Sequence, residues 1–310
     1  MPKVSVVIPT YNRKDTLGEA IDSVLHQIYT DYEIIVVDHG STDGSFEWMT
    51  RTYGNKIQAI RSEFCPLPAC PRNRGIEAAK GLYIAFLDSD DIWMPQKLAR
   101  QIDALENHAE FGWSYGKAVR FGNKTQEGTP EIGWWQVHSG SVFKSMLLGN
   151  FVPSCTVVVR AGALKEVGPF DMSPDLRSTE DYELWLRLAE RFPVYAVNET
   201  IAKYRVTADS VSENLASRFD PERKALESAQ RKLHVPEPLM RKAFAALHMR
   251  HFRYTIKTDP AKAMAHLESS WTLNPYAWRT ALYKSAATLG GAAAAQQLIG
   301  MEKWLKRSLG

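Results

Sequence analysis

Apolar runs rich in β-branched residues alternate with helical periodicity over the N-terminal third of the chain. Residues 4–8 read Val-Ser-Val-Val-Ile and stop at Pro9, whereas apolar side chains recur at helical spacing over 17–28. A second apolar run covers 32–37 and ends at Asp38. A strand, a helix and a strand in this order predict a βαβ unit, whose two strands are parallel neighbours.

Later segments add further strands and then a long helical end. Strands are expected at 56–60, 83–87, 156–159, 194–197 and 201–206, and helices at 98–105 and 180–191. Residues 111–150 show no clear period and are predicted to be irregular. From about residue 214 onward Ala, Leu, Lys, Arg and Gln dominate, which predicts helices. The pattern therefore predicts an α/β domain over 1–213 and a helical region over 214–310.

Charge is distributed unevenly between these two parts, although the formal net charge is only +3. Residues 215–310 carry 16 Lys and Arg against 7 Asp and Glu, a balance of +9, whereas residues 1–214 carry 22 against 28. The basic part contains no recognisable nucleic-acid module. We therefore expect no nucleic-acid partner, but a peripheral contact of the basic part with anionic lipid or another polyanion.

Composition and cysteine usage narrow the class of protein. A content of 45% hydrophobic and 24% charged residues excludes a disordered chain. The three cysteines include no Cys-x-x-Cys pair, which predicts neither a disulfide framework nor a zinc site. Neither a signal peptide nor a membrane-length apolar run is visible. These features predict a cytoplasmic protein, peripheral at the inner face of the membrane.

Polar side chains follow three of the predicted strands, beginning at Thr10, Asp38 and Asp88. Asp88 and Asp90 stand two positions apart after the strand at 83–87, so both carboxylates can converge on one Mg²⁺ or Mn²⁺ ion. The alternative is that they form a turn or cap the next helix. Asp38 can accept the ring N–H of a pyrimidine, or it can close an Asx-type turn.

Two further motifs carry charge at predicted helix starts. Arg72 can bind a diphosphate through its planar guanidinium, but an arginine at such a junction is also commonly solvated. Glu180 and Asp181 begin a helix, where the helix dipole favours anions and a carboxylate can take a proton from a sugar hydroxyl. The alternative for Asp181 is a capping box with Ser178.

In their order and spacing these motifs resemble glycosyltransferase family 2 over about residues 3–212. The matching segments are 4–13 (VSVVIPTYNR), 35–44 (IVVDHGSTDG), 72–76 (RNRGI), 86–91 (FLDSDD), 168–171 (GPFD) and 180–185 (EDYELW). The resemblance implies a GT-A fold: a Rossmann-like, mostly parallel central sheet flanked by helices. It also implies a nucleotide-sugar donor, a Mn²⁺ or Mg²⁺ ion, and inversion at the anomeric carbon.

The resemblance also assigns roles to the matching residues. The nucleotide and donor sugar would contact Pro9, Thr10, Tyr11, Asp38, Arg72, Asp88 and Ser89. The metal would bind Asp90 together with Asp88. Asp181 would be the general base, and the acceptor would contact Glu180, Trp134 and Trp135. The two tryptophans can stack on a sugar ring or belong to the core.

The sequence departs from the family pattern at some positions, and these departures limit which of the family's residue roles apply to this chain. His39 replaces a second acid that commonly follows Asp38, which argues against a uracil-specific contact and keeps dTDP- and GDP-sugars open beside the favoured UDP-sugar. After its last strand the family often has Tyr-Arg-x-His, whereas residues 204–207 (YRVT) lack the histidine. The Gln-x-x-Arg-Trp signature of processive synthases is absent, so one sugar is expected per encounter.

The expected function is cell-surface glycan biosynthesis on a glycan or lipid-linked acceptor. One alternative is a non-catalytic binding or scaffold protein that keeps the fold and holds partners through its helical part. A second is a sugar nucleotidyltransferase, which would need a Gly-rich, basic phosphate loop after the first strand. Residues 9–12 (PTYN) form no such loop.

Overall fold

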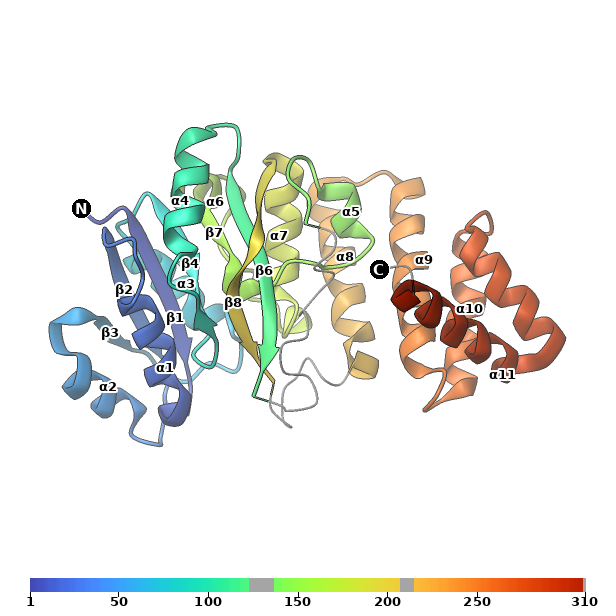
Figure 1. Cartoon of the computed structure of the whole chain (residues 1–310), viewed down its shortest axis with the longest axis horizontal. Helices are drawn as coiled ribbons and strands as arrows, with labels where there is room; N and C mark the ends of the chain where they lie inside the picture. The colour runs from blue at the N-terminus through green and yellow to red at the C-terminus, as the bar shows by residue number, and fades with distance from the viewer. Residues whose placement is uncertain (123–136, 207–214, 309–310) are drawn as a thin grey trace. The chain divides into compact units, whose positions relative to one another are not determined.

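The computed structural model describes residues 1–122, 137–206 and 215–308 (Figure 1). The chain divides into two compact units, residues 1–146 with 150–210, and residues 147–149 with 211–310. We call them the sheet unit and the helical unit, and each is described by itself.

The sheet unit is built on an eight-stranded mixed sheet, as far as the described residues extend, in the order β3-β2-β1-β4-β7-β6-β8-β5. The bounds are β1 (Val4–Thr10), β2 (Tyr32–Asp38), β3 (Gln58–Arg61), β4 (Tyr83–Phe86), β5 (Ile92–Trp93), β6 (Trp113–Phe121), β7 (Val158–Arg160) and β8 (Val194–Arg205). Strand β1 pairs in parallel with β2 and β4, and β2 pairs in parallel with β3. Strand β7 runs antiparallel between β4 and β6.

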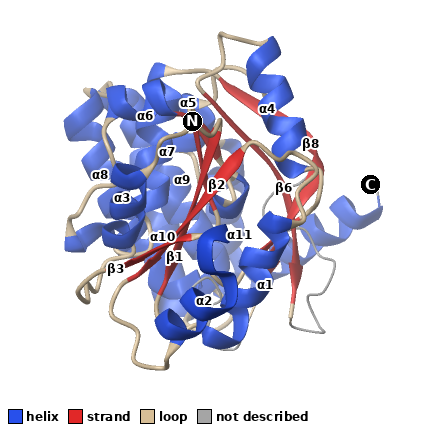
Figure 2. Ribbon diagram, turned by 90° about the vertical axis from the view of Figure 1, so that its left-hand side faces the viewer, coloured by secondary structure: helices blue, strands red, loops and turns tan. Residues whose placement is uncertain are grey.

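Helices cover both faces of this sheet, and the side chains of β1 show why (Figure 2). Val4, Val6 and Ile8 alternate with Val7, and all four are 0% exposed, as expected for a parallel strand buried on both sides. The helices packed around Val4, Val6 and Ile8 are α1 (Lys14–Leu25), α2 (Ser45–Tyr53) and α4 (Lys97–Asn107). The opposite face carries α3 (Ala69–Ala78) and α7 (Glu180–Arg191), with α6 (Ala161–Val167) beside α7. The predicted α/β fold class is confirmed.

Two predictions within 111–206 are wrong. Residues 113–121 form the long strand β6 instead of an irregular segment. The pattern concealed this strand because Trp113 to Gly116 are buried on both faces and show no alternation. Residues 194–205 form one strand, β8, instead of two, and its register against β6 shifts around Gly116 and Lys117. A Cβ atom on Gly116 would lie 2.5 Å from Cδ1 of Ile201, so only glycine fits this close approach.

The helical unit consists of helices that follow one another closely in sequence. Their bounds are α8 (Phe219–Leu233), α9 (Glu237–Thr255), α10 (Pro260–Leu273) and α11 (Trp278–Ser308). Helix α11 is interrupted by non-helical backbone at Gly290 and Gly291. One core cluster joins α9, α10 and both halves of α11 through Phe252, Leu267, Tyr283 and Ile299. The predicted helical C-terminal region is confirmed.

Among the described residues, none of the helices combines the length and the continuous apolar character that a bilayer crossing requires.

Candidate active site

The loops after β1 and β2 lie side by side because these strands are parallel and in register, with Thr10 opposite Asp38. Asn12 joins the two loops. Its backbone N–H donates to Ser41 Oγ at 2.8 Å, and its Oδ1 accepts from the Thr42 N–H at 2.8 Å. The φ angle of Asn12 is 49°, a left-handed conformation that asparagine tolerates better than most residues. The sequence motif contained Asn12, but its bridging role was not predicted.

Two buried oxygens at this strand edge lack hydrogen-bond partners. Asp38 is 0% exposed, and its Oδ1 accepts from the N–H groups of Gly40 at 3.1 Å and Ser41 at 3.0 Å. The Asx-type turn considered for Asp38 is therefore formed, yet Oδ2 remains buried without a partner. Thr10 Oγ1 is likewise buried without a hydrogen-bond partner. Because unpaired buried oxygens are costly, both atoms are available to a ligand that supplies donors.

Three rings gather beside these oxygens. The ring centroid of Tyr11 lies 5.0 Å from that of His39 and 5.1 Å from that of Phe64. His39 Nδ1 lies 2.8 Å from the Thr10 carbonyl oxygen, which can only accept, so Nδ1 carries the proton. Burial lowers the pKa of His39, which leaves its neutral ring with Nε2 as an acceptor. Phe64 and His39 were not among the predicted site residues.

Arg72, in α3, joins two acidic segments. Its Nη2 lies 2.7 Å from Asp88 Oδ1 and its Nη1 lies 2.6 Å from Glu180 Oε1. Burial acts to lower the pKa of Arg72, but the carboxylates of Asp88 and Glu180 outweigh it and raise that pKa. The alternative of a solvated arginine is excluded, because the side chain is only 8% exposed.

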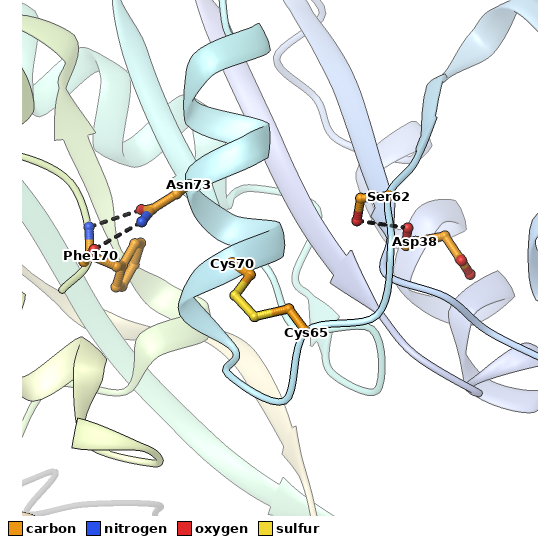
Figure 3. The surroundings of a disulfide bond; sticks show 6 residues. All are labelled: Asp38, Ser62, Cys65, Cys70, Asn73 and Phe170. Carbon is orange, nitrogen blue, oxygen red and sulfur yellow. Dashed lines mark hydrogen bonds between the residues drawn. A yellow bond between two sulfur atoms is a disulfide. The ribbon is translucent and has the colours of Figure 1, made fainter. Parts of the chain in front are cut away.

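The segment before Arg72 contains a disulfide between Cys65 and Cys70, which corrects the expectation from the sequence (Figure 3). The prediction was wrong because it rested on the absence of a Cys-x-x-Cys pair, whereas this bond joins cysteines five residues apart in a segment that contains two prolines. Cys155 is free and buried. In the next turn of α3, Asn73 exchanges two hydrogen bonds with the backbone of Phe170, at 2.8 and 2.9 Å (Figure 3). These bonds fix the start of α3 against the 168–171 motif.

The acidic loop after β4 is held from β8. Arg205 donates from Nε to the Asp90 carbonyl oxygen at 2.6 Å, and its backbone N–H donates to Asp91 Oδ1 at 2.8 Å. Asp91 is 1% exposed, and burial followed by repulsion from Asp90 and Asp88 raises its pKa well above the usual range. Burial followed by repulsion from Asp88 also raises the pKa of Asp90. Arg205 belongs to the 204–207 segment named from the sequence, but its contact with the acidic loop was not predicted.

The residues present fit a divalent ion that is coordinated partly by protein carboxylates and partly by phosphate oxygens and water. Within residues 1–122, 137–206 and 215–301, no three His, Cys, Asp or Glu side chains form a ready-made metal cluster. Asp88 and Asp90 nevertheless supply hard carboxylate oxygens at one loop, with Arg13 Nε 3.9 Å from Asp90. Mg²⁺ is commonly bound by one or two carboxylates, with phosphate oxygens and water completing its shell.

Glu180 and Asp181 lie in the first turn of α7, as predicted. Glu180 is 5% exposed, and its Oε2 is buried without a partner, whereas Asp181 is half-buried. The N-cap is Thr179, without a side-chain capping bond, so the capping box considered for Ser178 is not formed. Ser178 instead has a φ of 71°. Non-glycine residues in this conformation cluster at functional sites.

The remaining predicted residues are placed as follows. Pro9 lies within β1, and Ser89 is 7% exposed between Asp88 and Asp90. Trp134 and Trp135 lie outside the described residues. The described candidates Thr10, Asp38, Asp88 and Asp90 thus share one edge of the sheet, and Arg72 connects that edge to the start of α7.

Comparisons with known proteins show what the chain is similar to. The family model described as Glycosyl transferase family 2 matches residues 5–167. The UDP-Glc:alpha-D-GlcNAc-diphosphoundecaprenol beta-1,3-glucosyltransferase WfaP of Escherichia coli is 31% identical over 76% of this chain and 89% of its own. The Escherichia coli UDP-Glc:alpha-D-GlcNAc-diphosphoundecaprenol beta-1,3-glucosyltransferase WfgD is 33% identical over 68% of this chain and 80% of its own.

The crystal structure of S. aureus TarS 1–349 in complex with UDP-GlcNAc is similar in fold. It superposes with a TM-score of 0.64 at 16% sequence identity, covering 97% of this chain and 92% of that one. The predicted GT-A fold is thereby confirmed.

Proposed function

Because the chain belongs to glycosyl transferase family 2, we propose that it moves one sugar from a nucleotide-diphosphate sugar to a hydroxyl of a lipid-linked or polysaccharide acceptor. The observation that carries this proposal is the single edge shared by Asp38, Asp88 and Asp90, with α7 joined to it through Arg72. Ligands of α/β sheets bind at such carboxyl ends of strands. The glycosyltransferase activity follows from the family.

The nucleoside is proposed to bind at the ends of β1 and β2. The unpartnered Oδ2 of Asp38 and Oγ1 of Thr10 can accept its donors, while Pro9 and Tyr11 line the same loop. A UDP-sugar is favoured because WfaP and WfgD are named for UDP-Glc. dTDP- and GDP-sugars remain in the test panel, because His39 stands where the family commonly has an acid.

The donor sugar and its diphosphate are proposed to lie over the acidic loop. Asp88 and Ser89 would contact the ribose or the sugar, with Arg72 nearby. Asp90, assisted by Asp88, would hold Mn²⁺ or Mg²⁺. When bound, this ion neutralises the charge that develops on the departing diphosphate.

Asp181 is the proposed general base. At the first turn of α7 it lies near Arg72, which binds the neighbouring Glu180. It takes the proton from the acceptor hydroxyl, whose oxygen forms a bond to the anomeric carbon as the bond from that carbon to the diphosphate breaks. Attack opposite the leaving group inverts the anomeric centre. Glu180, Trp134 and Trp135 are proposed for the acceptor side.

A donor panel tests the proposal. The protein is incubated with UDP-, dTDP- and GDP-sugars, with an undecaprenyl-diphosphate GlcNAc acceptor, and with Mn²⁺, Mg²⁺ or a chelator. We expect nucleoside diphosphate release with one donor class, lost on chelation. Inert behaviour towards every donor, combined with tight donor binding, would instead support the non-catalytic scaffold.

The variant Asp90→Asn locates the metal. It should raise the Mn²⁺ concentration needed for half-maximal turnover by about tenfold or more, since carboxylate ligands dominate Mg²⁺ and Mn²⁺ binding. Asp103→Asn, at an exposed position on α4, is the matched control. Equal metal dependence of both variants would contradict the assignment of Asp90.

A further inference from the structure

The first half of α11 exposes a row of large apolar side chains. Trp278, Leu282 and Leu289 are 67%, 42% and 90% exposed, and Tyr276, in the loop before the helix, is 95% exposed. Because the helical positions are four and seven residues apart, they lie on one face of the helix. We call Tyr276, Trp278, Leu282 and Leu289 the α11 stripe.

The core of the helical unit does not use this face. The buried side of the same helix half presents Thr280, Tyr283 and Ala287, which are 3%, 0% and 9% exposed. Tyr283 packs its ring 5.3 Å from that of Phe252 in α9. Residues 278–289 of helix α11 are therefore apolar on two opposite faces, of which folding buries one. An apolar surface of this kind marks an interaction site.

Charge identifies the partner that fits the stripe. Residues 278–289 contain two basic side chains, Arg279 and Lys284, and no acidic one, and Lys284 forms an ion pair with Glu268 of α10. The Arg279 guanidinium lies 5.1 Å from the centre of the Trp278 ring, at the edge of the stripe. The surrounding region 215–310 is basic as a whole, with 16 Lys and Arg against 7 Asp and Glu. An anionic surface complements this charge.

The side chains themselves suit the boundary between water and lipid. Tryptophan and tyrosine favour the headgroup level, where an apolar ring and a polar tip are both satisfied. Leucines on the same face would enter the acyl region, and basic residues beside them would meet headgroups. We propose that the α11 stripe docks the protein on an anionic lipid bilayer. The reason for such docking rests on the proposed function, because a lipid-linked acceptor lies at a membrane surface.

Vesicle binding tests the proposal without donor, metal or acceptor, so its failure is distinct from failure of the transfer reaction. The full chain is sedimented with vesicles of phosphatidylcholine alone, or of phosphatidylcholine with about one third phosphatidylglycerol. We expect binding to the anionic vesicles to be about tenfold stronger, and to weaken in about 0.5 M salt. The variant W278S/L282S/L289S should lose at least about tenfold in binding.

A matched control separates the stripe from exposed apolar surface in general. Leu82→Ser removes a side chain in the sheet unit that is 66% exposed, and it should bind vesicles as the parent does. Circular dichroism of the triple variant checks that it is folded, and W278A alone should still weaken binding severalfold.

Three outcomes would overturn the inference. The parent chain binds neither vesicle, or the folded triple variant binds as well as the parent. In the third, the parent self-associates in solution through the stripe and added vesicles do not reduce this self-association. The stripe would then be an interface between copies of the chain.

Discussion

At the scale of single residues, Arg72 connects three parts of the sequence. Each of its partners was a candidate from the sequence, because acids after a strand and at a helix start are recognisable by position. The pairing itself was not predictable, since Asp88 is 16 and Glu180 is 108 residues away. Local patterns carry no information on contacts over such separations. The guanidinium was expected to bind diphosphate, and it is already engaged by two carboxylates.

Replacing Arg72 with Met should lower the free energy of unfolding by about 3–5 kcal/mol, because it leaves the carboxylates of Glu180 and Asp88 unpaired. Glu180 is 6% exposed at its side chain, which makes that loss large. Urea unfolding at neutral pH measures the change. The double variant Arg72→Met/Glu180→Gln should recover part of the loss, and a double variant no more stable than the single would contradict the pairing.

Arg205 should act on the metal through the backbone of Asp90. The variant Arg205→Met removes the 2.6 Å bond to the Asp90 carbonyl while the backbone bond to Asp91 remains. We expect the Mn²⁺ concentration for half-maximal turnover to rise about tenfold, with a smaller effect on turnover at saturating metal.

The control for Arg205 is Glu19→Gln, which breaks the exposed outer pair of the same guanidinium at 3.1 Å. It should change the metal dependence by less than about twofold. If Arg205→Met lowers only the maximal rate and leaves the metal dependence unchanged, the positioning role is wrong.

At the scale of elements, the close packing of α3 on β1 places Arg72 at the site. A Cβ atom on Gly75 would lie 2.3 Å from Val7 Cγ1, so the helix and strand approach as closely as glycine permits. Strands β1 and β2 were predictable because their β-branched runs end in polar residues, and β4 because its apolar run is followed by acidic residues. The approach of α3 was not, since a single glycine in a helix has several explanations.

The variant Gly75→Ala should therefore destabilise the protein by about 1–3 kcal/mol, because overpacking outweighs the gain in helix propensity. The matched control is Gly162→Ala in α6, where a Cβ atom meets nothing within 4 Å. That variant should lose no stability, and its free energy of unfolding should rise by up to about 1 kcal/mol, since alanine favours the helix. Equal effects of the two changes in thermal unfolding would contradict the packing argument.

At the scale of the whole molecule, the two units should respond differently to acid. Three histidines of the helical unit, His248, His251 and His266, surround the Phe219 ring at centroid distances of 4.6 to 5.1 Å. Burial lowers the pKa of His248 and of His251 to about 4, and it lowers that of His266. The folded unit therefore holds three neutral rings, two of them 3.0 Å apart at Nδ1.

Acid should accordingly loosen the helical unit. Below the unfolded pKa of about 6.5 the unfolded chain binds protons that the folded unit refuses, so stability falls between about pH 6.5 and 4. The neighbouring charges Glu222, Arg218, Arg250 and Lys262 modulate the shift. Hydrogen exchange of α9 and α10 should accelerate severalfold at about pH 5 relative to pH 7, after correction for intrinsic rates.

The double variant His248→Gln/His266→Gln should flatten this pH dependence. His26→Gln, an exposed position in the sheet unit, should leave it unchanged. A pH dependence that survives the double variant in full would show that other groups cause it.

The proposed reaction requires Asp181 to deprotonate the acceptor at the edge of the sheet that is proposed to bind the donor. The most direct measurement compares initial transfer rates of Asp181→Asn and Glu190→Gln, an exposed acid at the far end of the same helix. We predict that Asp181→Asn lowers kcat by about 10²- to 10⁴-fold with the dissociation constant of the donor unchanged, and that Glu190→Gln matches the parent. A kcat for Asp181→Asn within about threefold of the parent would contradict the claim.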